Sequence, residues 1–270
     1  MVVQHNLTAM NTNRQLGLTT SAQAKSTEKL SSGYKINRAG DDAAGLSISE
    51  KMRSQIRGLN KASDNAQDGI SLIQVAEGAL NETHSILQRM NELATQAAND
   101  TNTSVDRQSI KDEIKQLNEE LDRISSTTQF NKQDLLTGGF SGKLQVGALE
   151  GQTMDVKISL AVSAKGLKVS AVEVSTNAKA GAAMQSIQDA IESVSKQRSK
   201  LGAIQNRLEH TINNLDTNAE NTQAAESRIR DTDMADEMVQ YSKNNILSQA
   251  GQSMLTQANQ QTQGVLSLLQ

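Results

Sequence analysis

The side chains that most often carry enzyme chemistry are few in this sequence, and they stand far apart. The three histidines, His5, His84 and His210, fall on three separate predicted helices, without the short spacings that place metal ligands together. We interpret them as surface or helix-packing residues. The chain contains no cysteine, which excludes disulfides, thiolate nucleophiles and cysteine metal ligands.

One glycine-rich stretch, Gly138 to Lys143 (GGFSGK), has a superficial similarity to a phosphate-binding loop. The glycine spacing of that motif is missing, and Leu144 stands where a serine or threonine should follow the lysine. Neighbouring acids such as Glu119 and Glu120 belong to an exposed helix face, and no G-x-S-x-G nucleophile motif occurs. We therefore predict no catalytic residue, no metal site and no cofactor, and we expect that the chain is not an enzyme.

The composition favours elongated helix packing and argues against several classes of partner. The 270 residues include no proline or tryptophan and only two tyrosines and two phenylalanines, whereas compact cores depend strongly on aromatic side chains. A net charge of −3 provides no basic field for nucleic acid or anionic lipid. No window approaches about eighteen apolar residues, and the first nine residues lack the basic start and apolar core of a secretory signal. We predict no nucleic acid and no membrane partner, and any export must use another route.

The strongest pattern is an apolar repeat of seven residues between Ala43 and Asp100. One row runs from Met52 to Ala94, and a second row of small or apolar residues runs beside it from Ala62 to Ala97. Two such rows form the packing stripe of one long helix, which cannot bury that stripe without partner helices.

The rest of the central sequence supplies those partners. Apolar residues spaced four and three apart predict a helix from Val105 to about Thr127, and a heptad row predicts a second long helix from about Asn177 to Arg228. Over about residues 142–175 the apolar period changes to two. This change predicts a β-hairpin or a three-stranded patch that lies on the helices.

The two ends of the chain have matching, unusual compositions. Both are helical in pattern and rich in Asn, Gln and Ser, and Lys243 is the single charged residue between Val239 and Gln270. Uncharged polar groups cost less to bury than ions, so these helices suit burial against other chains. Glycine-rich and aspartate-rich breaks separate both ends from the centre. The predicted fold is therefore mainly α: an antiparallel coiled-coil or helix-bundle rod over residues 43–230 with one small β-hairpin region, and a paired terminal-helix domain of residues 1–42 and 231–270.

Three stretches resemble the signatures of bacterial flagellins. They are Leu30 to Met52 (LSSGYKINRAGDDAAGLSISEKM), Ser227 to Met238 (SRIRDTDMADEM) and Phe130 to Gly138 (FNKQDLLTG). The resemblance covers essentially the whole chain, except that the variable outer domains of the family, inserted near residues 140–178, are replaced by the hairpin alone.

The resemblance implies a function and a location. Family members self-assemble into the extracellular helical filament of the bacterial flagellum, used for swimming, after secretion through the flagellar type III export channel. It also implies three further sets of partners: a flagellar export chaperone, the filament cap and hook–filament junction proteins, and the vertebrate Toll-like flagellin receptor.

The same resemblance implies three sets of contact residues. The filament-core contacts are expected at Leu7, Met10, Leu18, Leu247, Met254, Leu255, Val265 and Leu268. The export chaperone is expected at Met254, Leu255, Val265 and Leu268. The receptor is expected at Gln88, Arg89, Glu92, Leu93 and Glu113, where the alternative is that the charged residues are ordinary solvated helix side chains.

Two other classes of protein share some of these features. A soluble coiled-coil adaptor or signalling hairpin, similar in composition to the cytoplasmic regions of chemoreceptors, would form a stable dimer and lacks the β patch. A membrane-active secretion translocator would need apolar stretches that this sequence does not contain.

Overall fold

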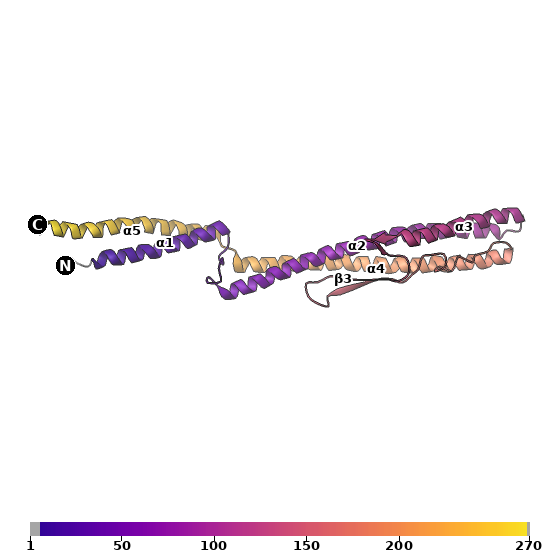
Figure 1. Cartoon of the computed structure of the whole chain (residues 1–270), viewed down its shortest axis with the longest axis horizontal. Coiled ribbons are helices and arrows are strands. Elements are labelled where there is room, and N and C mark those ends of the chain that lie inside the picture. The colour runs from indigo at the N-terminus through magenta and orange to yellow at the C-terminus, as the bar shows by residue number, and fades with distance from the viewer. Residues whose placement is uncertain (1–5, 269–270) are drawn as a thin grey trace. The chain divides into compact units, whose positions relative to one another are not determined.

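The structure is a computed structural model that describes residues 6–268, with side chains described for residues 6–261. The elements, in order, are α1 (Leu7–Ser32), α2 (Ala43–Ala97), α3 (Ser104–Thr127), β1 (Gln129–Phe130), β2 (Gln133–Asp134), β3 (Phe140–Gln145), β4 (Thr153–Ile158), α4 (Asn177–Arg230) and α5 (Met234–Leu268) (Figure 1). The predicted mainly α fold with one small hairpin region is confirmed.

The chain forms two compact units, which we name by their place in the sequence. The terminal unit comprises Met1–Ser54 and Asn221–Gln270, and the central unit comprises Gln55–Glu220. Each of the two long helices, α2 and α4, passes from one unit into the other. The two units are described separately below.

Polar side chains fix where the helices begin. The Asp42 carboxylate accepts a hydrogen bond from the Gly45 backbone N–H at 2.9 Å, and α2 starts at this point. Thr103 and Asp106 form a reciprocal capping box at the start of α3. The Asp233 carboxylate accepts hydrogen bonds from the first backbone amides of α5. These caps satisfy amides that have no partner within the helix.

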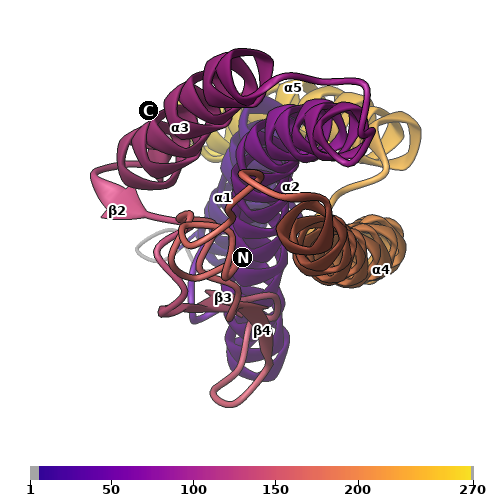
Figure 2. The same ribbon diagram turned by 90° about the vertical axis from the view of Figure 1, so that its right-hand side faces the viewer.

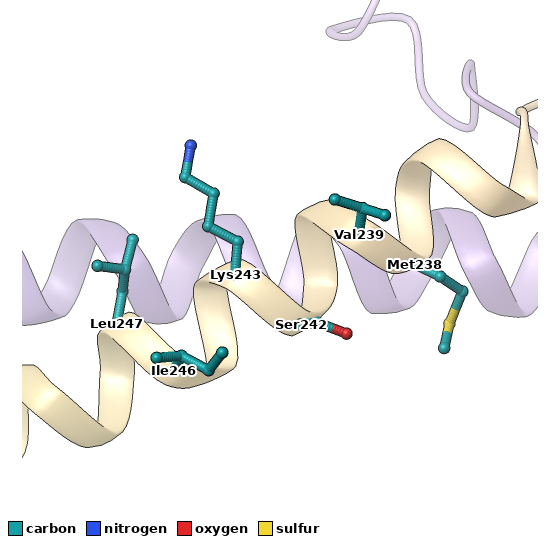
Figure 3. Close-up of a pocket in the computed structure, with 6 residues that line it drawn as sticks. All are labelled: Met238, Val239, Ser242, Lys243, Ile246 and Leu247. Carbon is teal, nitrogen blue, oxygen red and sulfur yellow. The ribbon is translucent and has the colours of Figure 1, made fainter.

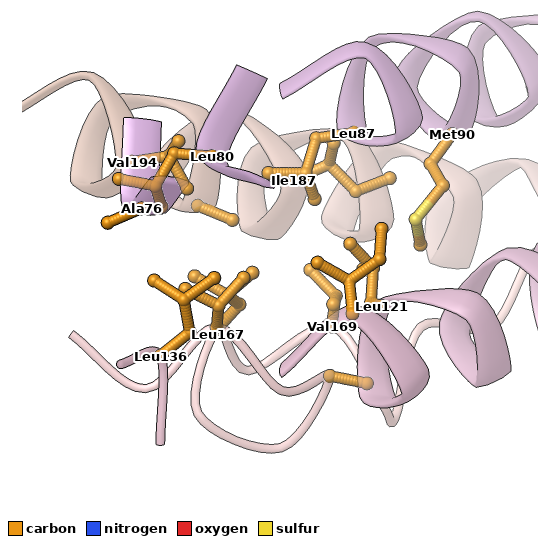
Figure 4. Packing of buried hydrophobic residues seen from close by; sticks show 14 of the residues in the cluster. Ala76, Leu80, Leu87, Met90, Leu121, Leu136, Leu167, Val169, Ile187 and Val194 are labelled. Carbon is orange, nitrogen blue, oxygen red and sulfur yellow. The ribbon is translucent and has the colours of Figure 1, made fainter. Parts of the chain in front are cut away.

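The core of the central unit is built from the heptad rows that the sequence predicts. Both rows of α2 are buried from Leu59 onward, against buried residues of α3 and α4. In Figure 4 the α2 residues Leu80 and Leu87 lie near Ile187 and Val194 of α4, with Leu121 of α3 nearby. Figure 2 views these helices from one end and shows α2 between α3 and α4.

The β-hairpin packs on this bundle by one face. Strands β3 and β4 are antiparallel, with Phe140 opposite Ile158 and Gln145 opposite Thr153. Alternate residues of β4, namely Met154, Val156 and Ile158, are buried, as a period of two requires. Residues 159–176 form no strand ladder, so the pattern here belongs to a hairpin and not to a three-stranded patch.

Two glycines of α2 allow the hairpin to approach the helix closely. A Cβ atom on Gly58 would lie 2.8 Å from the Ala148 Cβ, and one on Gly69 would overlap the Leu144 side chain. Between them, the Asn65 side-chain amide donates a hydrogen bond to the Gln145 carbonyl at 3.1 Å. The hairpin is therefore held to α2 by close packing against the helix backbone as well as by burial of apolar side chains.

The segment after β4 is irregular, yet it completes the core. Its residues Val162, Val169 and Val174 are buried, and the Ala164 backbone N–H donates to the Asp122 carboxylate of α3 at 2.8 Å. Nearer α4, the Glu173 carboxylate lies 2.5 Å from the Lys179 ammonium. The segment is thus held at both ends by polar contacts to neighbouring elements.

Candidate interaction surfaces

Helices α1 and α5 of the terminal unit pair through polar contacts and a close approach at a glycine. Helix α1 lies beside α5 (Figure 1). The Asn6 side chain donates a hydrogen bond to the Ala258 carbonyl at 2.9 Å, and the Lys29 ammonium lies 3.4 Å from the Glu237 carboxylate. At Gly251 the Leu16 side chain approaches so closely that an added Cβ would lie 3.3 Å from it.

Several large apolar side chains of these helices are exposed. Exposed residues include the predicted contacts Leu7, Met10, Leu18, Leu247 and Met254. Leu255 is half-buried, whereas the side chains of Val265 and Leu268 lie outside the described residues. The helix pair therefore leaves several large apolar residues exposed, while Leu16 and Leu255 are half-buried. An ordinary amphipathic pair would cover most of its apolar stripe.

A concave apolar area lies on the outer side of α5 (Figure 3). It is a shallow hollow of about 500 Å³ lined by Met238, Val239, Ser242, Lys243, Ile246 and Leu247. Lys243 forms no ion pair with any described side chain. Met238, Val239 and Ile246 were not predicted as contact residues from the sequence. The scarcity of charged residues in this segment was the available signal, because it indicated that the surface of this helix becomes buried.

A compact joint holds the inner ends of α1 and α5. Gly33 ends α1 in the left-handed conformation (φ 76°), which glycine adopts at little cost, and its carbonyl accepts a hydrogen bond from the Thr232 N–H. Tyr34 pairs with Asp231 in an isolated β-bridge. The Arg230 guanidinium lies 4.5 Å from the centre of the Tyr34 ring and 3.2 Å from the Glu50 carboxylate.

A separate polar cluster on the central unit contains the predicted receptor residues. The Arg89 guanidinium lies 2.9 Å from the Glu113 carboxylate of α3 and 3.2 Å from the Glu92 carboxylate. Hydrogen bonding to Glu113 and, to a smaller extent, to Glu92 raises the pKa of Arg89 above its ordinary value, so the guanidinium keeps its positive charge. Gln88 is exposed beside this cluster, while Leu93 is buried beneath it. The structure thus brings the four polar residues together and places Leu93 in the core.

The other residues with possible chemistry do not converge. His84 lies beside Gln88, His210 is exposed on α4, and His5 lies outside the described residues. The Gly138–Lys143 stretch leads into strand β3 and does not precede a helix as a phosphate loop would. Among the described residues, no group of three or more His, Asp or Glu could hold a metal. No described helix is long and apolar enough to span a bilayer.

Comparison with known proteins gives consistent results over the full chain. Residues 3–141 match the family described as bacterial flagellin N-terminal helical region, and residues 184–269 match the bacterial flagellin C-terminal helical region. A flagellin of Halalkalibacterium halodurans is 55% identical, and a flagellar filament 31.3 kDa core protein of Treponema maltophilum is 52% identical, with 100% of each chain covered in both cases. The crystal structure of a Bacillus cereus flagellin is 34% identical and covers 60% of this chain and 94% of its own, with a TM-score of 0.51.

Proposed function

This chain belongs to the bacterial flagellin family, and we propose that it self-assembles into the helical filament of the bacterial flagellum through the outer faces of α1 and α5. The family is structural and not enzymatic. The filament's location outside the cell and its use in swimming are part of this proposal. The proposal also includes the contacts that assembly requires, with the terminal unit supplying the filament core.

The observation that carries the assembly proposal is the exposed apolar surface of the terminal unit. Leu7, Met10 and Leu18 of α1, and Leu247 and Met254 of α5, are large apolar residues that the single chain leaves in contact with water. Burial of one such side chain stabilises a contact by about 1.5–3 kcal/mol, so their burial between copies would strongly favour association. Contacts between different surfaces of successive copies produce an open helix when the rotation from copy to copy does not close into a ring.

Seeded elongation tests this proposal. Purified monomer is added to short filament seeds, and the product is measured by sedimentation and electron microscopy. Leu247→Asp should prevent elongation, because it places a charge in the apolar contact. Val105→Asp is the control, since Val105 is also an exposed apolar residue and lies on the central unit. Normal elongation by Leu247→Asp, or discrete dimers from the unaltered chain, would contradict the proposal, and dimers would favour the coiled-coil adaptor.

We further propose that the monomer binds the vertebrate Toll-like flagellin receptor through Gln88, Arg89, Glu92 and Glu113. The support is that Arg89 is exposed, permanently charged and already oriented by two carboxylates on two helices. Leu93, which is buried, would contribute by supporting this surface from beneath. A preoriented side chain loses less conformational entropy on binding than a free one.

Receptor affinity should fall in Arg89→Ala and stay unchanged in a control. Arg123 is a suitable control, because it is also an exposed arginine paired with a carboxylate, that of Glu120. Binding of the receptor ectodomain to each monomeric variant can be measured by surface plasmon resonance. Equal affinity of Arg89→Ala and Arg123→Ala would remove this assignment.

Export and capping complete the proposal. We propose that the chain leaves the cell through the flagellar type III export channel, with an export chaperone bound to Met254, Leu255, Val265 and Leu268 of α5. The filament cap and the hook–filament junction proteins would bind assembled copies. The exposure of Met254 on an otherwise charge-poor helix supports a chaperone contact, since a chaperone would shield it before assembly. Loss of chaperone binding in Met254→Asp, measured by calorimetry, would support this contact.

A further inference from the structure

The methionines of this chain divide sharply by position. Four are exposed: Met10 (64%), Met234 (49%), Met238 (50%) and Met254 (60%), and all four belong to α1 or α5. In the central unit, by contrast, Met90 is completely buried and Met154 is 8% exposed. Met52 and Met184 are half-buried, and Met1 lies outside the described residues.

The exposed methionines are among the large apolar residues that α1 and α5 leave exposed in the single chain. Met238 lines the hollow on α5 together with Val239, Ile246 and Leu247 (Figure 3), and Met234 precedes it by one helical turn. Thioether side chains are flexible and polarizable, which suits a surface that must adapt to a partner. The same exposure leaves each sulfur open to oxidants in solution.

We propose that Met10, Met234, Met238 and Met254 are reversible oxidation sites through which peroxides control assembly. The proposal rests on the assembly function proposed above. A sulfur lone pair of each thioether attacks the peroxide, the O–O bond breaks, and one oxygen is transferred to sulfur. The thioether is oxidised by two electrons to the sulfoxide, and hydrogen peroxide is reduced to water.

The consequence follows from the change in polarity. A sulfoxide is a strong hydrogen-bond acceptor, and burial without a partner is unfavourable. The apolar contact between copies would then have to bury up to four such groups. Inside an assembled filament the same sulfurs would be covered and would react slowly. Oxidation should therefore block the addition of new copies more readily than it damages existing filaments.

Brief hydrogen peroxide treatment of the monomer, followed by peptide mass spectrometry and seeded elongation, tests this inference. We expect sulfoxides at the four exposed methionines before any at Met90 or Met154. We expect the monomer concentration needed for elongation to rise by at least about tenfold. A methionine sulfoxide reductase with a dithiol reductant should restore elongation.

A variant that cannot be oxidised provides the matched control. The combined substitution of Met10, Met234, Met238 and Met254 by leucine keeps an apolar side chain of similar volume. Whatever the elongation rate of this variant, that rate should be the same with and without peroxide. If this variant does not elongate seeds at all, the test is whether the reductase restores elongation by the oxidised natural chain.

Several outcomes would overturn the inference. They are unchanged elongation by a monomer with sulfoxides at these positions, equally fast oxidation of Met90 and Met154, or no recovery after reduction. Failure of the untreated monomer to elongate seeds would instead contradict the assembly proposal. Elongation by the untreated monomer that is insensitive to oxidation would refute this inference alone.

Discussion

Two glycines of α2 have opposite surroundings, so the same substitution should have opposite effects at the two positions. A Cβ at Gly58 would lie 2.8 Å from the Cβ and 3.3 Å from the Cα of Ala148, in the turn between β3 and β4. A Cβ at Gly78 would meet no atom within 4 Å. Both glycines lie inside the helix and inside the central unit.

The expected change in the free energy of unfolding is the sum of two opposing effects. Replacing a helical glycine by alanine raises the free energy of unfolding by about 1 kcal/mol, and this gain applies at both positions. At Gly58 the new methyl group must displace the hairpin turn, and such overpacking costs about 1–3 kcal/mol. Gly78→Ala should therefore stabilise the chain by about 1 kcal/mol, whereas Gly58→Ala should range from no change to a loss of about 2 kcal/mol.

Urea unfolding of dilute monomer, followed by circular dichroism, measures both variants. Adding Ala148→Gly to Gly58→Ala removes the closest atom, and the two changes should couple favourably in a double-mutant cycle. Equal stabilisation by Gly58→Ala and Gly78→Ala would refute the reasoning, because it would mean that the hairpin turn does not approach α2 as closely as the structure indicates.

Three further predictions concern the core, the joint and acidity. Leu80→Ala removes a completely buried side chain and should lower the free energy of unfolding by about 2–5 kcal/mol in the same urea assay. Arg230→Ala removes the guanidinium over the Tyr34 ring and should speed hydrogen exchange of the adjacent backbone amides, and unchanged exchange would exclude a role in the joint. The hydrogen bond from the Lys179 ammonium is the main cause that lowers the pKa of the Glu173 carboxyl below its ordinary value of 4.5. Since the folded pKa is the lower one, this stabilisation is complete above pH 4.5 and is lost as pH falls through the folded pKa, so the stability difference between the natural chain and Glu173→Gln should shrink in acid.

The fold of the central unit could be predicted from the sequence because its apolar heptad rows are buried by helices of the same chain. The row from Leu59 to Ala94 and its neighbour to Ala97 are buried as the heptad spacing requires. The short β1–β2 pairing was not predicted. Its turn uses Asn131 and Lys132 with φ values of 49° and 63°, and lysine is not a residue that signals such a turn.

The terminal unit shows where sequence periodicity becomes ambiguous. The helical pattern of α5 and its expected contacts Leu247 and Met254 were recognised, and in the single chain these two residues are exposed whereas Ala258 is buried. A periodic apolar stripe indicates that a face will be covered, and it does not specify whether the covering helix belongs to the same chain. Here the small residues that allow close approach, such as Gly251, determine the intramolecular face.

The pairing of α1 with α5 also has a consequence for the order of folding. The hydrogen bond from Asn6 to Ala258 joins residues that are 252 positions apart in the chain. Contacts of such high sequence separation carry a large loop-closure entropy and form slowly, whereas the β3–β4 hairpin and the packing of α2 on α3 join segments that are much nearer in the chain. During synthesis α1 emerges first and has to wait for the last segment of the chain before it gains its partner. The terminal unit should therefore be the last part to fold, and its amides the last to gain protection in pulse-labelling hydrogen exchange.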